Sequence, residues 1–420
     1  MVNQESRVNP FTPDQPVAPE LFAGRADEIG QVKAALLRTL GGRGEHILIQ
    51  GERWMGKSST ALYIENMAKE ADRVLKPGGS FFTACCRLGA CRDVEEVCVV
   101  ILDQFRTLQN SLRNRALDFL SQVRGLTIGM FGVQLDRDPT RPPLVPIFPR
   151  VFERLIQEAR ESHNAFLIIL DETEHASSLQ GMASFLKTLL EQLAADGFRD
   201  VMFLMTATPD GVERLVEDHP SFPRLFRHVN LAPMSRQESD ELFRKALDRG
   251  DPVVSITEEA LELGHFYSDG FPGVLQEIGY SAFDINRDEV IDRFDLTQGM
   301  LGPNGVKGAV DTLYDKHFHR ILTQQLLSDR YRDILAVVAD SAIRSPSETV
   351  SFREISAALS GKLNSQSIGG YLAQLVRRGV LRKTEGKRGE YALASRMLGL
   401  WLRLDRFRRE QKGAPRNSHS

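Results

Sequence analysis

The stretch Gly51-Glu52-Arg53-Trp54-Met55-Gly56-Lys57-Ser58 fits the pattern G-x-x-x-x-G-K-[ST], and it decides the fold of this chain. It directly follows the apolar run HILIQ at 46–50 and leads into the helical pattern STALYIENMAKE at 59–70. A loop placed between a strand and a helix in this way points successive backbone N–H groups at a phosphate. The sequence therefore predicts an α/β domain built around a phosphate-binding loop.

Four positions of this phosphate-binding loop have a predicted task. Gly51 and Gly56 let the backbone curl, Lys57 bridges the β- and γ-phosphate oxygens, and Ser58 ligates Mg²⁺. Trp54 is bulky, but the variable positions of such a loop tolerate side chains that point away from the phosphates. We therefore expect ATP and Mg²⁺ as ligands. The nucleotide contacts are expected from Gly51, Glu52, Arg53, Trp54, Met55, Gly56, Lys57, Ser58 and Ser59.

A second motif is the apolar run FLIILDE at 166–172, which ends in two carboxylates. Burial of the strand places both acids at its carboxyl edge, where ligands bind in open α/β sheets. We expect Asp171 to hold the Mg²⁺ through water and Glu172 to polarise the water that attacks the γ-phosphate. The alternative is that these two acids form an ordinary solvated turn. The phosphate-binding loop upstream in the sequence favours the catalytic interpretation.

Two threonines and two arginines are further candidates. Thr206 and Thr208 follow the run VMFLM at 201–205, and their hydroxyls can reach the attacking water or the γ-phosphate; capping of a helix by Thr208 is an equal alternative. Arg224 or Arg227 is expected to reach the nucleotide of a neighbouring subunit and to stabilise transition-state charge. An ordinary surface arginine fits the sequence equally well. The predicted catalytic set is Glu172, Lys57, Thr206 and Arg227.

The core of the chain alternates short apolar runs with helical patterns, which is typical of a parallel sheet covered on both faces. We therefore predict a P-loop α/β fold with a five-stranded parallel sheet. Residues 134–147 carry prolines and charges and are expected to form a surface loop. The five predicted strands are HILIQ at 46–50, SFFTACC at 80–86, AFLIIL at 165–170, VMFLMTA at 201–207 and HVNLA at 228–232.

Changes in pattern along the chain predict six segments. A nucleotide-binding core is followed by a helical lid, a helical linker and a C-terminal domain whose three helices precede a hairpin. Three helices and a two-stranded wing are typical of a winged helix-turn-helix. The predicted bounds are 1–20 for an extended N-terminal arm, 21–232 for the core, 233–300 for the lid, 301–327 for the linker, 328–410 for the winged helix and 411–420 for a disordered tail.

Composition excludes several classes of protein. The chain has 420 residues, of which 42% are hydrophobic and 26% charged, so wholesale disorder is excluded. No apolar run approaches the roughly 18 residues of a membrane-spanning helix, and the start lacks a basic region before an apolar stretch. We expect a cytoplasmic protein without a membrane partner. The four cysteines lack the spacing of a zinc site and are expected to be reduced thiols: Cys85, Cys86, Cys91 and Cys98.

Charge divides unevenly along the chain. Residues 328–420 carry 18 basic and 9 acidic side chains, whereas residues 1–327 carry 35 and 47. A basic C-terminal domain on an acidic body favours a polyanion partner, and we predict duplex DNA. The third helix opens with small polar residues, so weak sequence reading is expected; a winged helix that contacts only protein is the alternative. The predicted DNA contacts are Arg377, Arg378, Arg382, Lys383, Lys387 and Arg388.

Taken in order, these motifs resemble those of the AAA+ ATPases of the origin-recognition and archaeal-initiator type and of the related STAND-like ATPases. The resemblance extends over residues 10–405 and rests on Phe22-Ala23-Gly24-Arg25-Ala26-Asp27-Glu28, the phosphate-binding loop, the LDE strand and Asp269-Gly270-Phe271-Pro272-Gly273. It implies that the segment from Pro10 to Arg25 lines the adenine pocket. It also implies that a helix starting near Pro272 closes over the nucleotide.

One departure from the initiator pattern favours the STAND-like branch. Initiator-type proteins usually carry an arginine early in that lid helix, and here the sequence reads Gly273-Val274-Leu275-Gln276-Glu277. The leading hypothesis is an ATP-hydrolysing switch that binds DNA and self-associates with nucleotide. The alternatives are a STAND-like signalling ATPase whose winged helix contacts a protein effector, and a nucleotide-binding protein that hardly hydrolyses ATP.

Overall fold

The computed structural model divides the chain into two compact units, Gln15–Pro233 and Met1–Asp14 with Met234–Ser420. The unit boundary at 233/234 lies one residue from the predicted boundary between core and lid. The structure describes residues 7–107, 110–123, 126–129, 132–135, 140, 143–303, 306–326, 328–342, 349–384, 387 and 389–413.

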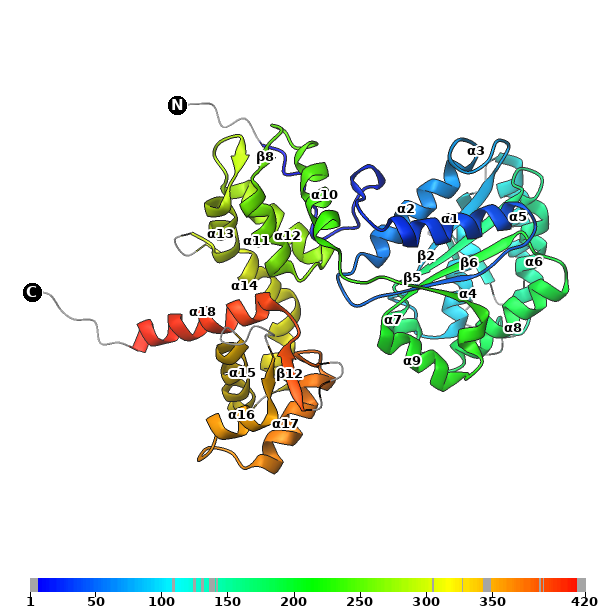
Figure 1. Ribbon diagram of the computed structural model, residues 1–420. Helices are drawn as coiled ribbons and strands as arrows, with labels where there is room; N and C mark the ends of the chain where they lie inside the picture. Colours follow the sequence, from blue (N-terminus) through cyan, green and yellow to red (C-terminus); the bar gives the residue numbers. More distant parts are fainter. Residues whose placement is uncertain are drawn as a thin grey trace, which may run out of the picture. The chain divides into compact units, whose positions relative to one another are not determined.

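The unit Gln15–Pro233 is built on a five-stranded, entirely parallel sheet (Figure 1). Its strand order is β2-β5-β6-β1-β7. The central strands β5 and β6 are buried along their whole length, which explains their continuous apolar sequences. The predicted α/β fold and its five strands are therefore confirmed. The strands are β1 Ile47–Gln50, β2 Phe81–Arg87, β5 Ala165–Asp171, β6 Val201–Ala207 and β7 Arg227–Asn230.

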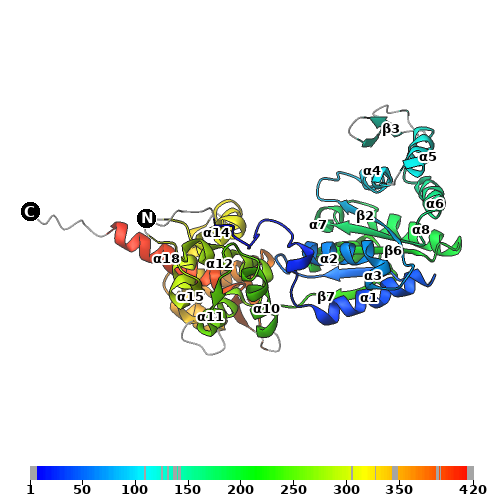
Figure 2. The same cartoon turned by 90° about the horizontal axis from the view of Figure 1, so that it is seen from above.

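Helices cover both faces of this sheet, with α1 and α2 on one side and α4, α6 and α8 on the other (Figure 2). One large apolar core joins the second group of helices to β2, β5 and β6. The helices are α1 Ala26–Leu40, α2 Lys57–Lys69, α3 Ala71–Val74, α4 Val94–Asp103, α5 Asn110–Ser121, α6 Phe148–Ala159, α7 Thr173–Ala176, α8 Met182–Ala195 and α9 Pro209–Asp218. The 3-10 turns are η1 Pro19–Leu21, η2 Gln104–Thr107 and η3 Phe222–Leu225.

The segment between α4 and α6 differs from the expected single surface loop at 134–147. An antiparallel hairpin of β3 Leu126–Gly129 and β4 Gly132–Leu135 takes the first two residues of that range. Leu144, near its end, is fully buried in the core. The prediction was wrong at both ends. Strands of four residues are too short for an alternation of apolar and polar residues to be detected. Leu144 stands among prolines, and the sequence does not show which core residues it packs against.

The other unit begins with four helices that correspond to the predicted lid. A short parallel pair, β8 Ser255–Ile256 and β9 Val290–Ile291, accompanies them. Side-chain caps fix three of the helix starts: Ser235 before α10, Thr257 before α11 and Asp292 before α13. The helices are α10 Arg236–Leu247, α11 Glu258–Ser268, α12 Pro272–Ile285 and α13 Arg293–Leu301.

The N-terminal arm docks onto this lid through one buried ring. Phe11 packs edge-on against Phe243 at 5.9 Å and covers Gly279, where a Cβ would collide with the ring. The Thr12 N–H donates to Gln276 at 2.9 Å. The arm, which is rich in polar residues and proline, is thus anchored by the buried Phe11 ring together with polar contacts such as that of Thr12.

The rest of this unit is helical with a small three-stranded sheet of order β10-β12-β11. The sequence pattern predicts three helices and a hairpin here, and the structure has α15, α16, α17 and the hairpin β11–β12; β10 was not predicted. α18 runs to Gly413, past the expected boundary at 410, and residues 414–420 lie outside the described residues. The elements are α14 Ala309–Leu313, the π-helical turns η4 Tyr314–Phe318 and η5 Ile321–Gln325, α15 Asp329–Ala342, β10 Val350–Ser351, α16 Phe352–Ala358, α17 Ser365–Arg377, β11 Leu381–Lys383, β12 Glu390–Leu393 and α18 Arg396–Gly413.

The expectation of reduced thiols is met. All four cysteines are free thiols, and burial raises the pKa of Cys86 well above its ordinary value. Among the described residues, none of the helices combines the length and the apolar character that a membrane crossing requires.

Replacing Phe11 by alanine should loosen the arm and destabilise the unit to which it belongs. The ring is 2% exposed, and deleting a buried aromatic ring usually costs about 3 kcal/mol of unfolding free energy. Chemical denaturation measures the loss. Phe294→Ala is the control, because that ring is 66% exposed in the same unit. Equal losses in the two variants would contradict the anchoring role of Phe11.

Candidate functional site at the carboxyl edge of the sheet

The phosphate-binding loop joins the carboxyl end of β1 to the first residue of α2. Gly56 has φ 81°, a left-handed conformation that glycine adopts without strain. Gly51 is close-packed, since a Cβ there would lie 3.2 Å from the side chains of both Leu231 and Met55. The Lys57 ammonium donates to the carbonyls of Gly51 and Glu52, each at 3.1 Å. The sequence pattern therefore folds into a compact loop with its lysine held over it.

Two predicted residues meet next to this loop. The Thr206 hydroxyl, at the end of β6, donates to Asp171 Oδ1, at the end of β5, at 2.5 Å. Both side chains are buried. The Thr173 hydroxyl donates to the Thr206 carbonyl and ties the start of α7 to the same strand. Sequence reasoning did not select Thr173, because a hydroxyl with a backbone partner on another strand leaves no local pattern.

Glu172 follows in a left-handed conformation, with φ 58°. Its side chain is exposed at the carboxyl edge of the sheet, and Gly89, just past β2, leaves room for it. A Cβ on Gly89 would lie 2.7 Å from Glu172 Oε2. Four described residues other than glycine have positive φ, and three of them are predicted site residues: Arg25, Trp54 and Glu172. Backbone strain of this kind gathers at functional sites.

Arg25 supports the loop backbone from within the core unit. The side chain is buried, donates to the carbonyl of Met55 at 3.3 Å and to that of Ala232, and lies 3.3 Å from Glu28. Close by, the Val17 N–H donates to the Ser59 hydroxyl at 3.1 Å. Residues of the arm and of the Phe22 to Glu28 motif thus frame the start of α2.

Two predicted residues have other positions. Thr208 caps α9, where its hydroxyl accepts from the Gly211 N–H at 3.2 Å, so the capping alternative describes it. Pro272 is the first residue of α12 in the other unit, and its approach to the nucleotide stays a prediction.

The oxygen donors at this edge suit a magnesium ion. Ser58 offers a hydroxyl in the first turn of α2, and Asp171 offers the carboxylate oxygens that Thr206 leaves available. Mg²⁺ binds one or two protein oxygens of this kind and takes its other ligands from water and phosphate. The described residues contain no cluster of three or more metal-binding His, Cys, Asp or Glu side chains.

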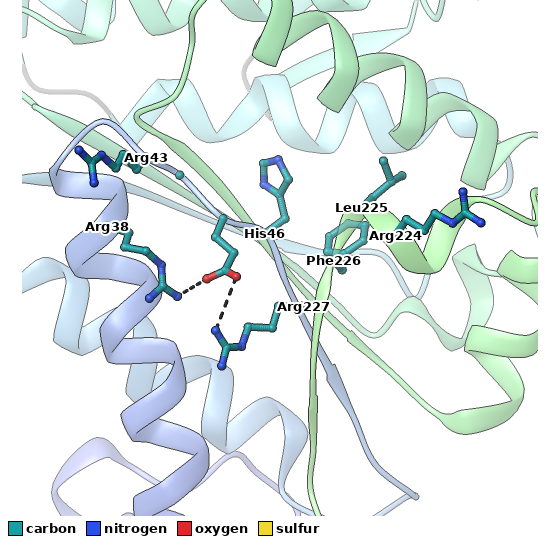
Figure 3. A pocket seen from close by; sticks show the side chains of 9 residues that line it. Arg38, Arg43, His46, Arg224, Leu225, Phe226 and Arg227 are labelled. Atoms are coloured by element: carbon teal, nitrogen blue, oxygen red, sulfur yellow. Dashed lines mark hydrogen bonds and ion pairs between the residues drawn. The ribbon is translucent and has the colours of Figure 1, made fainter.

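Arg224 and Arg227 lie at the opposite edge of the sheet. Arg227 is the first residue of β7 and pairs with Ile47, the first residue of β1. Both arginines are exposed and line a cavity together with the end of α1 (Figure 3). They therefore stand apart from the phosphate-binding loop of their own chain, as a residue that serves another subunit must.

The predicted DNA contacts divide into three groups. Arg377, Arg378, Arg382 and Lys383 are exposed at the end of α17 and on β11. Lys387 lies 3.5 Å from Glu390, and Arg388 lies outside the described residues.

The sequence of residues 21–203 matches the family model of the AAA ATPase domain. These residues form an AAA ATPase domain. The AAA+ resemblance deduced from the motifs is thereby confirmed. The match spans the phosphate-binding loop, Asp171 and Glu172, and it ends before Thr206. No curated protein matches the sequence of the chain.

Solved structures share the fold over nearly the whole chain. The ORC2 protein of Aeropyrum pernix, solved with ADPNP and ADP, superposes with a TM-score of 0.58 at 16% identity, covering 93% of this chain and 95% of that one. A Walker-type ATPase of Pyrococcus abyssi superposes with a TM-score of 0.54 at 16% identity, covering 91% and 96%. At this identity the likeness establishes an AAA+ fold and nothing finer.

Gly89→Ala should lower ATP turnover without weakening ATP binding. The added methyl group would displace the Glu172 carboxylate, and moving a catalytic group by about 1 Å costs about 100-fold in rate. Steady-state turnover and nucleotide affinity are the measurements. Gly30→Ala is the control, because a Cβ at that α1 position meets nothing within 4 Å. Unchanged turnover in Gly89→Ala would argue against Glu172 as the base.

Proposed function

We propose that the protein is an ATP-hydrolysing switch that binds DNA through its C-terminal region. The observation that carries the ATPase proposal is the meeting of the phosphate-binding loop, the Asp171–Thr206 pair and the exposed Glu172 at one edge of the sheet. Loop N–H groups and Lys57 hold the triphosphate, and Glu172 accepts a proton from the attacking water. Ser58 and Asp171 would hold a Mg²⁺ ion, which would supply positive charge to the phosphates.

Thr206 is a positioning residue in this scheme. Its hydroxyl is already donated to Asp171, so it orients the carboxylate and leaves the attacking water to Glu172. Arg227 or Arg224 would serve the nucleotide of a second copy, because both stand at the edge opposite to their own loop. Self-association with nucleotide follows from that arrangement, and slow hydrolysis would reset it.

The C-terminal region is proposed to be a winged helix that docks on duplex DNA. The order of α15, α16, α17 and the hairpin β11–β12 supports this assignment. Arg377 and Arg378 at the end of α17 and Arg382 and Lys383 on the wing are exposed and suited to phosphates.

Three arginines of α18, Arg406, Arg408 and Arg409, are poor candidates for the same surface. Arg408 pairs with Asp311 at 2.8 and 3.0 Å, Arg406 with Asp340 at 2.7 Å and Arg409 with Asp405 at 2.8 Å. Phosphate contacts would have to compete with these pairs. We therefore assign the proposed DNA face to α17 and the wing.

The STAND-like signalling ATPase stays the second candidate, for one reason. Arg396, at the start of α18, pairs with Asp269 at 2.9 Å and lies over the Phe266 ring at 4.2 Å. Asp269 directly precedes the Gly270-Phe271-Pro272 turn into α12. This contact links the C-terminal region to the lid, which suits a domain that regulates the ATPase. A cytoplasmic location is proposed for either candidate.

Lys57→Ala should abolish ATP turnover by removing the charge that contacts the β- and γ-phosphates. Glu172→Gln should bind ATP as the unsubstituted protein does and lose roughly 100-fold or more in turnover, because it removes a general base. Phosphate release and equilibrium nucleotide binding distinguish the two effects. If turnover is low in the unsubstituted protein and unchanged in Glu172→Gln, the result would favour the nucleotide-binding protein that hardly hydrolyses ATP.

Arg382→Gln combined with Lys383→Gln should weaken binding to duplex DNA and flatten its salt dependence. Every DNA phosphate that the variant no longer neutralises lowers the slope of log K against log salt by about 1. Fluorescence anisotropy at several salt concentrations measures the slope. Lys69→Gln with Arg73→Gln removes two exposed charges from the other unit and is the matched control. An unchanged slope would favour the protein-docking candidate.

A further inference from the structure

A cavity of about 510 Å³ opens at the amino edge of β1 and β7, opposite to the phosphate-binding loop. Three segments line it: the end of α1, the turn into β1, and η3 with the start of β7. Figure 3 shows their side chains. The lining residues are Arg38, Arg43, Gly44, Glu45, His46, Arg224, Leu225, Phe226 and Arg227.

The charge of this arginine pocket is strongly unbalanced. Four arginines and a single carboxylate, that of Glu45, line it. Arg38 and Arg227 converge on this carboxylate from two sides, Arg38 by a direct ion pair and Arg227 at 3.7 Å (Figure 3). Arg43 and Arg224 are exposed at the two ends of the pocket, and neither forms an ion pair with any other described residue. The protein thus supplies an anion for two of the four arginines.

The floor of the pocket is rigid, and it adds no charge of its own. The Gly44 N–H bonds to the Arg199 carbonyl at 2.6 Å, and a Cβ on Gly44 would lie 2.7 Å from that oxygen. The His46 ring accepts a hydrogen bond from the Phe203 N–H at 3.1 Å and lies against the Phe203 and Phe226 rings. Burial lowers the pKa of His46 to about 4, with Glu45 acting in the opposite direction. At neutral pH the excess positive charge therefore belongs to the arginines.

We propose that the arginine pocket binds a free polyphosphate group, with Arg38 and Arg227 on one phosphate and Arg43 and Arg224 closing on the next. Guanidinium groups bind phosphate oxygens in pairs, and their long side chains allow the two outer arginines to fold inward. The cavity is large for a single ion, since one water occupies about 30 Å³ in the liquid. A ligand here would leave the phosphate-binding loop of the same chain open to ATP, and it would compete with the nucleotide of a second copy for Arg224 and Arg227.

Pyrophosphate is the probe, and the full-length Lys57→Ala variant is the background, because it weakens phosphate binding at the other edge. Calorimetry should give one site per chain. Arg38→Gln with Arg43→Gln should weaken that site at least about tenfold, since removing one charged hydrogen bond costs about that factor. The Lys69→Gln, Arg73→Gln pair again serves as the control. Equal affinity in the pocket variant and the control would overturn the proposal.

His46 gives a second readout that does not depend on affinity. An anion beside the ring favours the imidazolium, so bound pyrophosphate should raise the pKa of His46 above about 4 in an NMR titration. An unchanged His46 titration at saturating pyrophosphate would place the ligand elsewhere and contradict the proposal.

A neighbouring copy's nucleotide offers the same phosphate chemistry, so the source must be separated. Pyrophosphate binding should persist at protein concentrations where sedimentation shows a monomer. If pyrophosphate leaves the His46 titration unchanged, and the titration shifts only when Glu172→Gln loaded with ATP is added and the chains associate, the ligand belongs to the neighbour. The free-polyphosphate proposal then fails. Neither result depends on turnover, because the Lys57→Ala background lacks it.

Discussion

The hydrogen bond from the Thr206 hydroxyl to Asp171 is the interaction on which the ATPase site depends. It joins the ends of β5 and β6, the two fully buried strands at the centre of the sheet. A carboxylate buried in that position requires a donor, because an unpaired one costs several kcal/mol. Strand register, carboxylate orientation and the turn that exposes Glu172 are therefore a single arrangement, and none of them can shift alone.

The role of each arginine in this chain depends on the groups that it contacts. Arg406 and Arg408 on α18 each have a carboxylate on another helix, Arg25 has backbone carbonyls, and the wing leaves Arg382 and Lys383 exposed. Net charge alone predicted a basic C-terminal domain. The ion pairs with carboxylates determine which of its basic side chains are available to a partner. A second local excess of positive charge lies around Glu45 in the core unit.

Sequence predicted the parts of the structure that local pattern encodes. Buried parallel strands read as continuous apolar runs, and the loop from Gly51 to Ser58 has one main structural use, so the sheet and the phosphate site were predictable. Partners distant in the chain were not: Asp340 lies 66 residues from Arg406, and Phe11 finds Phe243 in another segment. Gly89 is a single glycine after a strand. Its role, which is to leave room for Glu172, depends on a residue that follows the neighbouring strand β5.

The docking of Phe11 also changes how the two units are connected. Because residues up to Asp14 belong with the lid, the chain passes between the units twice, once after Asp14 and again after Pro233. The unit that contains the lid is therefore discontinuous in sequence, and a truncation at Gln15 would remove an aromatic ring from its buried core.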